Sequence, residues 1–236
     1  MRLGKSRTDS CDPKTNGEHN FAEQIAGACR TIFDVGARTD DYFVHLNQRC
    51  QYHLFEPMAN SFSKLKQKVG ALPNVHLVNT ALGSQQGTLR IHPDTQSIHK
   101  RPHGSESSQP IKIQRLDDYC QANEIREIDF LKIDVEGHEY EVMQGGENMI
   151  RNGVSMLQFE YGGTYREVGM TLANVFAFLG PKWFFYRITH NGLIAVETFT
   201  NKLETYRYAN YVAARRPLNH CLRSHSSLVS RWFRKQ

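Results

Sequence analysis

The sequence predicts an α/β fold whose sheet is doubly wound and mostly parallel, with an antiparallel C-terminal edge. From Thr31 onward, short β-type runs alternate with helical runs, a pattern that predicts parallel strands joined by right-handed crossovers. An Asn191-Gly192 pair between two β-rich runs predicts a hairpin near the C-terminal end. The length of 236 residues suits one such domain.

The expected elements of the parallel part alternate in type along the chain. A helix over 19–30 precedes three expected strands at 31–36, 52–57 and 74–82, which are separated by expected helices over 40–49 and 60–70. The fourth strand is expected at 129–137, its helix at 139–153 and the fifth strand at 154–161.

Two segments depart from this alternation. Residues 88–93 and 111–119 are expected to pair at an edge around a loop over 92–110, which is dense in Pro, Ser, His and Gly. Residues 183–197 form the expected hairpin, and 205–215 supply a further strand of the antiparallel edge.

Three regions divide the chain. Residues 1–18 are polar and aperiodic, which favours a flexible lead-in, and 19–214 are expected to form a single domain. Residues 215–236 form a basic tail with five arginines, one lysine and no acid, so the rest of the chain carries about −1 of the formal +5. A nucleic-acid enzyme would need a basic folded surface, and we therefore expect no nucleic-acid partner.

Cysteine usage and hydropathy indicate the compartment. The five cysteines are odd in number and scattered without a CxxC spacing, which favours a reduced, cytoplasmic environment. No apolar run approaches the roughly 20 residues that span a bilayer, and the N-terminus is too polar for a signal peptide. We expect a soluble protein whose oligomeric state is open.

The turn after the first expected strand indicates the kind of cofactor. A dinucleotide site needs a G-x-G-x-x-G turn that receives a pyrophosphate, but here Gly36 stands alone and Asp40 and Asp41 follow. Two carboxylates would repel a phosphate and tolerate the sulfonium of S-adenosyl-L-methionine. Both aspartates could equally cap a helix.

Glu56 provides a second signal. It ends the second expected strand, twenty-two residues after Asp34, where an acid can accept hydrogen bonds from both hydroxyls of an adenosine ribose. The alternative interpretation is a solvated carboxylate at a strand end that Pro57 closes.

Several motifs resemble the FkbM family of S-adenosylmethionine-dependent methyltransferases. These motifs are FDVGA, FEP, NTALG with the later Gly87, RLDDY and, above all, FLKIDVEGHEYEVMQGG. The resemblance spans about residues 32–161 and continues more loosely to 213. KIDVEGHE at the fourth strand is its most specific part.

This resemblance implies a class I methyltransferase fold, Rossmann-like, with strand order 3-2-1-4-5-7-6. It also implies methyl transfer to a hydroxyl oxygen on a sugar, glycan or natural product. Asp34, Gly36 and the adjoining Ala37 would border the methionine part of the cofactor and Glu56 its ribose, while Asn79 and Ala81 would lie near adenine. Family members usually carry a second glycine where this chain has Asp40, which puts cofactor affinity in question.

The residues after the fourth strand are the candidates for chemistry. Methyl transfer to oxygen needs an aligned acceptor hydroxyl and a group that removes its proton. Asp134, Glu136 and His138 are the expected catalytic residues, with histidine the natural base near neutral pH. Glu136 and Glu139 could instead only mark a helix N-terminus, where acids favour the dipole, and His138 could be a surface residue of its first turn. A D-x-E-x-H run could chelate a divalent cation, but alternate positions at a turn need not converge, and no metal is expected.

Two rival functions stay open. One is a nicotinamide-dependent oxidoreductase, which the missing glycine cradle disfavours, and the other is a catalytically inactive cofactor-binding module. The leading interpretation is a transferase for a small-molecule or glycan acceptor. The tail places Leu218, Leu222, Val229 and Trp232 at helical spacing among basic residues, which suits weak contact with an anionic membrane surface, or else packing on the domain.

Overall fold

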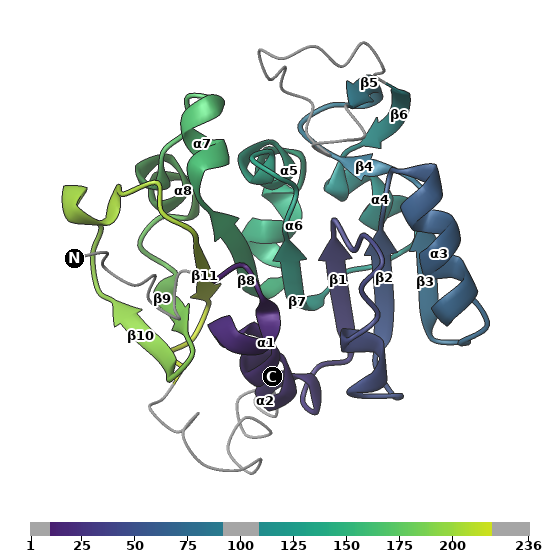
Figure 1. Cartoon of the computed structure of the whole chain (residues 1–236), viewed down its shortest axis with the longest axis horizontal. Coiled ribbons are helices and arrows are strands. Elements are labelled where there is room, and N and C mark those ends of the chain that lie inside the picture. Colours follow the sequence, from purple (N-terminus) through teal and green to yellow (C-terminus); the bar gives the residue numbers. More distant parts are fainter. Residues whose placement is uncertain (1–9, 92–108, 219–236) are drawn as a thin grey trace, which may run out of the picture.

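The computed structural model describes residues 10–91 and 109–218 and places eight strands in one sheet (Figure 1). Its order is β10-β9-β11-β8-β7-β1-β2-β3. The parallel strands are β1 (Thr31–Val35), β2 (Gln51–Phe55), β3 (Val75–Val78), β7 (Ile128–Ile133) and β8 (Val154–Tyr161). The antiparallel edge consists of β11 (Ala209–Ala214), β9 (Phe184–Thr189) and β10 (Gly192–Val196). The predicted fold is confirmed, including the order 3-2-1-4-5-7-6 and the hairpin at Asn191-Gly192; β10 extends the edge by one strand.

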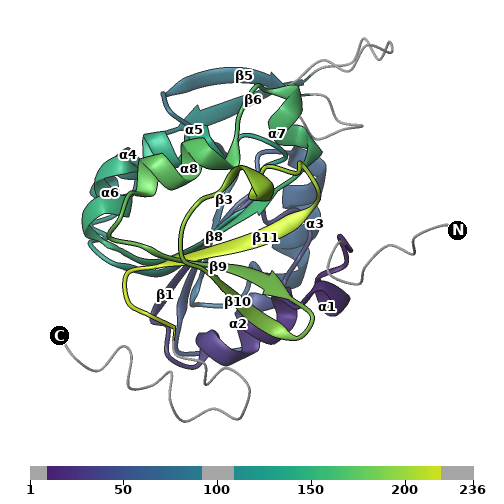
Figure 2. The same ribbon diagram turned by 90° about the vertical axis from the view of Figure 1, so that its left-hand side faces the viewer.

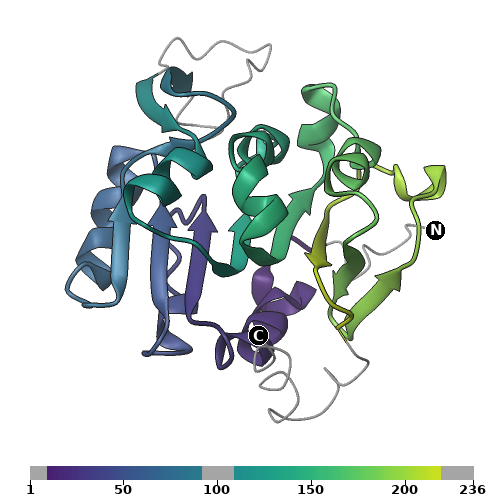
Figure 3. The ribbon, with the colours of Figure 1, turned by 180° about the vertical axis from the view of Figure 1, so that it is seen from behind.

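Helices cover both faces of this sheet. One face carries α2 (Glu18–Ala26), α3 (Ala59–Val69) and the short 3₁₀ helix η2 (Phe43–His45). The opposite face, which Figure 3 presents to the viewer, carries α4 (Leu116–Ala122), α5 (Glu139–Gly145), α6 (Glu147–Asn152) and α8 (Leu172–Leu179). The remaining helical segments are α1 (Pro13–Asn16), α7 (Gly163–Glu167) and η3 (Asn201–Leu203).

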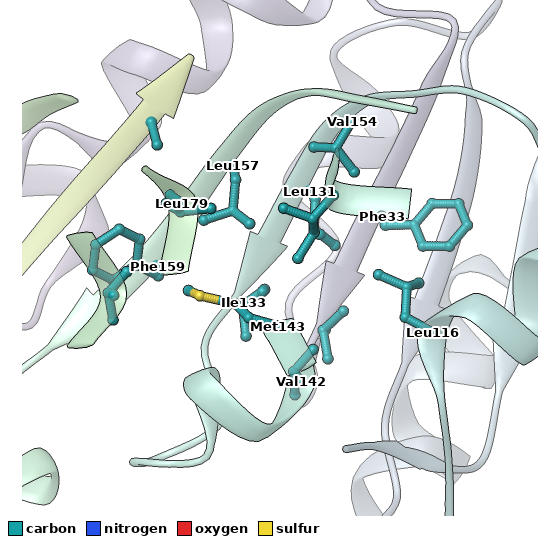
Figure 4. Packing of buried hydrophobic residues seen from close by; sticks show 14 of the residues in the cluster. Phe33, Leu116, Leu131, Ile133, Val142, Met143, Val154, Leu157, Phe159 and Leu179 are labelled. Atoms are coloured by element: carbon teal, nitrogen blue, oxygen red, sulfur yellow. The ribbon is translucent and has the colours of Figure 1, made fainter. Parts of the chain in front are cut away.

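The period of two along β7 divides its side chains between the two faces. Leu131 and Ile133 are fully buried on the side of α5, where Val142 and Met143 pack near them (Figure 4). Phe130 points to the other side and joins the apolar cluster under α2. Lys132 shares that second side, so a charged residue lies between the buried Phe130 and the end of the strand.

A second, three-stranded sheet lies beside the carboxyl ends of the parallel strands (Figure 2). It contains β4 (Ala81–Leu82), β6 (Gln109–Gln114) and β5 (Gly87–Ile91), with β5 and β6 antiparallel. The expected pairing of 88–93 with 111–119 is therefore confirmed in part. The second strand of this pair, β6, ends at Gln114 because α4 begins at Leu116. Asp117 in α4 accepts hydrogen bonds from the backbone N–H groups of Asn148 and Met149 at the start of α6.

The expected helix over 40–49 is wrong. Only the 3₁₀ turn η2 forms, and its buried Phe43 and Val44 pack in the same cluster as α2. The Asn47 amide donates to the carbonyl oxygens of Ala26 and Cys29 at 2.9 and 3.1 Å. Tertiary contacts with α2 thus take the place of a helical ladder.

The expected helix over 139–153 divides into α5 and α6 at Gly146. At Gly145 and Gly146 the backbone passes close to Gly83 and to Leu116 of α4. A Cβ on Gly145 would lie 1.9 Å from the carbonyl oxygen of Gly83, and one on Gly146 would lie 2.5 Å from Leu116. Two glycines are needed for this approach, and they also weaken a continuous helix.

Each of the two predicted flanking segments contributes residues to the packed domain: the lead-in at its C-terminal end and the tail at its N-terminal end. Within the expected lead-in, Asn16 and Glu18 are buried, and Glu18 accepts a hydrogen bond of 2.9 Å from Gln158 of β8. In the expected tail, the Arg215 guanidinium lies over the Trp183 ring and the Leu218 N–H donates to the Tyr186 hydroxyl. These contacts extend the packed domain beyond 19–214; the tail interpretation for 219–236 lies outside the described residues.

Candidate active site

A pocket opens beyond the carboxyl ends of β1, β2 and β7, where the second sheet covers it. Ligands in open α/β sheets bind at this edge because connections leave in opposite directions there. The pocket is lined by residues of the strand ends and of the second sheet: Val35, Gly36, Arg38, Phe55, Glu56, Pro57, Met58, Thr80, Ala81, Leu82, Gly83, Ser84, Gln85, Leu89, Ile91, Ile111, Ile113, Asp134, Val135, Glu136, His138 and Glu141.

The turn after β1 passes close to β7 at Gly36. Its φ of +91° lies in the left-handed region, and a Cβ there would be 1.9 Å from the carbonyl oxygen of Asp134. The N–H groups of Gly36 and Ala37 both donate to the carbonyl oxygen of Phe55. Glycine is therefore required here by packing as well as by backbone conformation. Gly36 lines the pocket, whereas Ala37 is buried beneath it.

Glu56 lies at the end of β2 with only 3% of its surface exposed. Its two carboxylate oxygens accept hydrogen bonds from the N–H groups of Met58 at 2.7 Å and Arg38 at 2.9 Å. Burial raises the pKa of this carboxyl group, and the two backbone donors and Arg38 oppose that shift. Each oxygen keeps a further lone pair that a ligand hydroxyl could use.

Asn79 and Ala81 follow β3. The Asn79 amide donates to the backbone carbonyl oxygens of Glu56 at 2.8 Å and Pro57 at 3.2 Å. Asn79 therefore holds the peptide that carries Glu56, although it is not among the lining residues. Ala81 does line the pocket and begins β4.

Lys132 joins two of the predicted site residues. Its ammonium nitrogen lies 2.9 Å from Asp134 and 3.7 Å from Asp34. Asp34 and Lys132 are direct register partners on β1 and β7, so the parallel pairing itself brings these opposite charges together. Asp34 is buried outside the pocket, and Asp134 lines it.

The charges in this cluster respond in opposite ways. Burial raises the pKa of Asp34 to about 6, against the attraction of Lys132. Burial also opposes ionisation of Asp134, but the Lys132 ammonium, the Arg38 charge and a hydrogen bond from Glu160 together outweigh it and lower the pKa of Asp134. Glu160, at the end of β8, has its pKa raised to about 10 by burial and by the negative charge of Asp134. At neutral pH, Asp134 is thus an anion and Glu160 a neutral acid.

Glu136 and Arg38 form an ion pair across the pocket, with 3.4 Å between Arg38 Nη2 and Glu136 Oε1. They belong to the loops after β7 and β1. Both have left-handed backbones, with φ of +57° and +53°, which is uncommon for residues other than glycine. Such conformations persist where the surrounding structure determines them.

His138 also lines the pocket, and its Nδ1 lies 3.2 Å from Glu141 Oε2. Between them in sequence, Glu139 is 1% exposed and accepts hydrogen bonds from the N–H groups of Val135 at 2.9 Å and Gly137 at 3.3 Å. Burial raises the pKa of Glu139 to about 8. Glu139 thus shapes the turn after β7, while His138 and Glu141 face the pocket.

The other half of the pocket is apolar. The second sheet contributes Leu82, Leu89, Ile91, Ile111 and Ile113, and Met58 follows β2. Met58, Ile91 and Ile111 pack together as a small cluster separate from the main core. A flat aromatic ring would be suited to this wall, since it buries apolar surface without needing many polar partners.

The pocket therefore brings together Gly36, Glu56, Ala81, Asp134, Glu136 and His138 of the predicted site, whereas Asp34, Ala37 and Asn79 are not among its lining residues. Asp40 and Asp41 do not lie where the cofactor was expected to meet them. Neither lines the pocket; Asp40 accepts from the N–H of Tyr42, and Asp41 pairs with Lys68 and His45.

Sequence reasoning missed Lys132, Arg38, Glu141 and Glu160. A signal existed for Lys132, because a lysine within the apolar run DFLKI is costly unless a partner meets it. Nothing in the spacing pointed to Arg38 or Glu141. In residues 10–91 and 109–218, no group of three or more His, Cys, Asp or Glu side chains is arranged to hold a metal ion. No helix in these same ranges combines the length and apolar character needed to cross a bilayer.

The strand order, together with a pocket at the carboxyl ends of the central strands, defines the class I methyltransferase fold. Residues 34–212 match the family described as Methyltransferase FkbM domain, and the chain belongs to this family.

Two curated proteins are similar to this chain. The 2-O-methyltransferase NoeI of Sinorhizobium fredii is 26% identical over 141 residues, covering 50% of this chain and 58% of the relative. The hexuronic acid methyltransferase AglP of Haloferax volcanii is 26% identical over 125 residues, covering 51% and 52%. The chain thus spans about half the length of the curated relatives it matches. The crystal structure of an FkbM methyltransferase from Methylobacillus flagellatus aligns with a TM-score of 0.49 and 13% identity, covering 79% of this chain and 44% of that one.

Proposed function

We propose that this protein is an S-adenosyl-L-methionine-dependent O-methyltransferase acting on a hydroxyl group of a sugar, glycan or related natural product. The observation that carries the proposal is the pocket, which combines Glu56 at the end of β2 with the Asp134 cluster at the end of β7. Family membership supports methyl transfer. The names of the two relatives, which specify 2-O-methyl transfer and a hexuronic acid, favour a sugar hydroxyl as the acceptor.

The chemistry of the lining residues fits the cofactor. Glu56 lines the pocket and would accept hydrogen bonds from ribose hydroxyls, and the apolar wall of the second sheet is suited to adenine. The turn at Gly36 and the carboxylate of Asp134 would border the methionine part. When bound, the cofactor supplies an electrophilic methyl group on a positively charged sulfur, which the surrounding carboxylates favour.

Asp134 is suited to orient the acceptor. Lys132 keeps its carboxylate ionised and fixes one oxygen at 2.9 Å, so that an acceptor hydroxyl can donate a hydrogen bond to the remaining lone pairs. The same ion pair makes Asp134 a weak base, because a carboxylate stabilised as an anion holds a proton poorly. Its role is therefore to align the hydroxyl oxygen with the methyl group.

His138 is suited to receive the proton that the hydroxyl loses. Glu141 lies 3.2 Å from its Nδ1, and a carboxylate in this position orients the imidazole and favours the imidazolium that forms. In the proposed reaction the hydroxyl oxygen gains the methyl group, His138 gains the proton, and the donor leaves as a neutral thioether. Cys29, Cys50 and Cys120 are buried and form no disulfide within the part of the chain that the structure describes, which supports a cytoplasmic site for this reaction.

The proposal is tested first by binding. Isothermal titration calorimetry with S-adenosylhomocysteine and with NAD⁺ should detect binding of the first and none of the second. Methyl transfer from isotopically labelled S-adenosylmethionine to a panel of neutral and acidic sugars then identifies the acceptor class by mass spectrometry. Binding of NAD⁺ instead would favour the oxidoreductase. Cofactor binding without transfer to any hydroxyl acceptor would contradict the proposed activity.

A further inference from the structure

The charges around the pocket are unequal in number. Four carboxylates line the pocket, those of Glu56, Asp134, Glu136 and Glu141. Among the described residues 10–91 and 109–218, Arg38 is the only basic side chain of the lysine or arginine type that lines it. An excess of carboxylates suits a ligand with positive groups. A single guanidinium in the same wall suits a ligand that also carries one anion.

Arg38 is held in a definite position. Its N–H donates to Glu56 at 2.9 Å, which ties its backbone to the predicted ribose residue. Its guanidinium reaches Glu136 at 3.4 Å across the pocket, and both residues have left-handed backbones. The side chain is still 50% exposed, so the guanidinium is accessible from the pocket. Five N–H donors let an arginine hold Glu136 and a second carboxylate together.

We propose that Arg38 binds the α-carboxylate of the methionine part of the cofactor and so selects the intact amino acid. This inference rests on the proposed function. The cofactor has two positive groups, a sulfonium and an α-ammonium, and one negative carboxylate. The carboxylates of the pocket are complementary to the sulfonium and the α-ammonium, and Arg38 is complementary to the carboxylate. Arg38 follows Gly36 by two residues, at the end of β1 where the methionine part is expected, and planar guanidinium–carboxylate pairs are well suited to such recognition.

Decarboxylated S-adenosylmethionine provides the test, because it keeps the adenosine, the sulfonium and the amine and lacks only the carboxylate. Calorimetry would compare both compounds on the unaltered protein, on Arg38→Gln and on Arg151→Gln. Arg151 is a matched control, since it also pairs with a glutamate, Glu147, at 2.7 Å but lies away from the pocket.

Arg38→Gln should weaken binding of S-adenosylmethionine by about tenfold or more, the effect of losing a charge-assisted hydrogen bond, and leave binding of the decarboxylated compound unchanged. Arg151→Gln should change neither. An equal loss for both compounds, or no loss for either, would overturn the assignment, with melting temperatures showing that each variant is folded. If the unaltered protein binds neither compound, the proposed function itself fails.

Discussion

Lys132 places an ammonium group between Asp34 and Asp134 on the face of the sheet that α2 covers. Burying a single lysine in a strand would cost several kcal/mol without partners. The register of β1 and β7 supplies one partner and the end of β7 the other. The charge state of Asp134 is consequently a property of this cluster.

Asp134→Asn tests the role of that charge. The variant keeps the shape of the side chain and an oxygen acceptor for Lys132, while Asp34 still balances the lysine at 3.7 Å. We expect turnover to fall by about 100-fold or more, since an amide aligns the hydroxyl poorly, with a melting temperature close to that of the parent. The checks are methyl-transfer rates with a validated acceptor and thermal melting. A parental rate in a folded variant would show that Asp134 has no chemical role.

Glu56→Ala removes the carboxylate expected to hold ribose. Charge-assisted hydrogen bonds contribute roughly 1.5 to 3 kcal/mol each, so the dissociation constant for S-adenosylmethionine should rise about tenfold or more. The Arg38 and Met58 N–H groups also lose their acceptor, and some loss of thermal stability should accompany the change. Glu147→Ala, at an exposed helical glutamate, is the control. An unchanged dissociation constant would remove the ribose assignment.

At the scale of elements, the junction between β7 and α5 contains a buried acid. Burial raises the pKa of Glu139 from 4.5 to about 8, so the folded chain keeps a proton that the unfolded chain releases near 4.5. The stability from this group is present below pH 4.5 and is lost as pH rises toward 8, with a slope of at most about 1.4 kcal/mol per pH unit. Glu139→Gln cannot ionise and should avoid this loss.

The melting temperature of Glu139→Gln relative to the parent should therefore increase between pH 5 and pH 8.5. Taking this difference removes the contribution of Asp34, which titrates in both proteins, and reports on Glu139 together with its interactions with Asp134 and Glu160. The glutamine oxygen can still accept from Val135 and Gly137, where the glutamate now does. A difference that stays constant with pH would mean that Glu139 is already ionised in the fold.

The contact between α5 and the second sheet is the other test at this scale. A Cβ on Gly145 would lie 1.9 Å from the carbonyl oxygen of Gly83, a residue of the pocket wall. Gly145→Ala should destabilise the protein by about 1 to 3 kcal/mol in chemical denaturation and weaken cofactor binding. Gly163→Ala in α7 meets nothing within 4 Å and should be neutral or stabilising by up to about 1 kcal/mol. Equal stability of the two variants would contradict this packing.

At the scale of the whole molecule, residues before the matched family region 34–212 pack on the central sheet next to Lys132. Glu18 accepts hydrogen bonds from Gln158 and Asn16 at 2.9 and 2.6 Å, and Gln158 is the register partner of Lys132. Polar groups buried in this way need their partners. The segment predicted to be a flexible lead-in is thus in part a structural component.

Glu18→Ala should lower the free energy of unfolding by about 1 to 3 kcal/mol, because Gln158 and Asn16 would lose a buried acceptor. Glu23→Ala in the same helix changes an exposed acid that accepts a hydrogen bond from the Tyr42 hydroxyl, and should have little effect. Urea denaturation of both variants measures the difference. If Glu18→Ala unfolds at the parental urea concentration, the N-terminal contacts add no stability.

The sequence alone was sufficient for the alternation of strands and helices, the hairpin at Asn191-Gly192 and the positions of Gly36, Glu56 and Asp134. These features depend on hydrophobic periodicity, turn-forming residues and family motifs, all of which can be recognised from residues close together in the sequence. It failed at 40–49, where packing against α2 overrides helical periodicity, and at Asp40, which accepts a hydrogen bond from the Tyr42 N–H and does not line the pocket.

Only the tertiary structure decided which charges meet. The Lys132–Asp34 contact depends on strand register, and the Arg38–Glu136 and His138–Glu141 contacts depend on how two loops and a helix start converge. The energies of these groups follow from burial and from partners distant in sequence, and neither can be read from spacing. The polar residues at the ends of β1, β2 and β7 were thus partly predictable, but the apolar wall and the electrostatics of the pocket arose from folding, because packing and Coulomb interactions act through space and not along the chain.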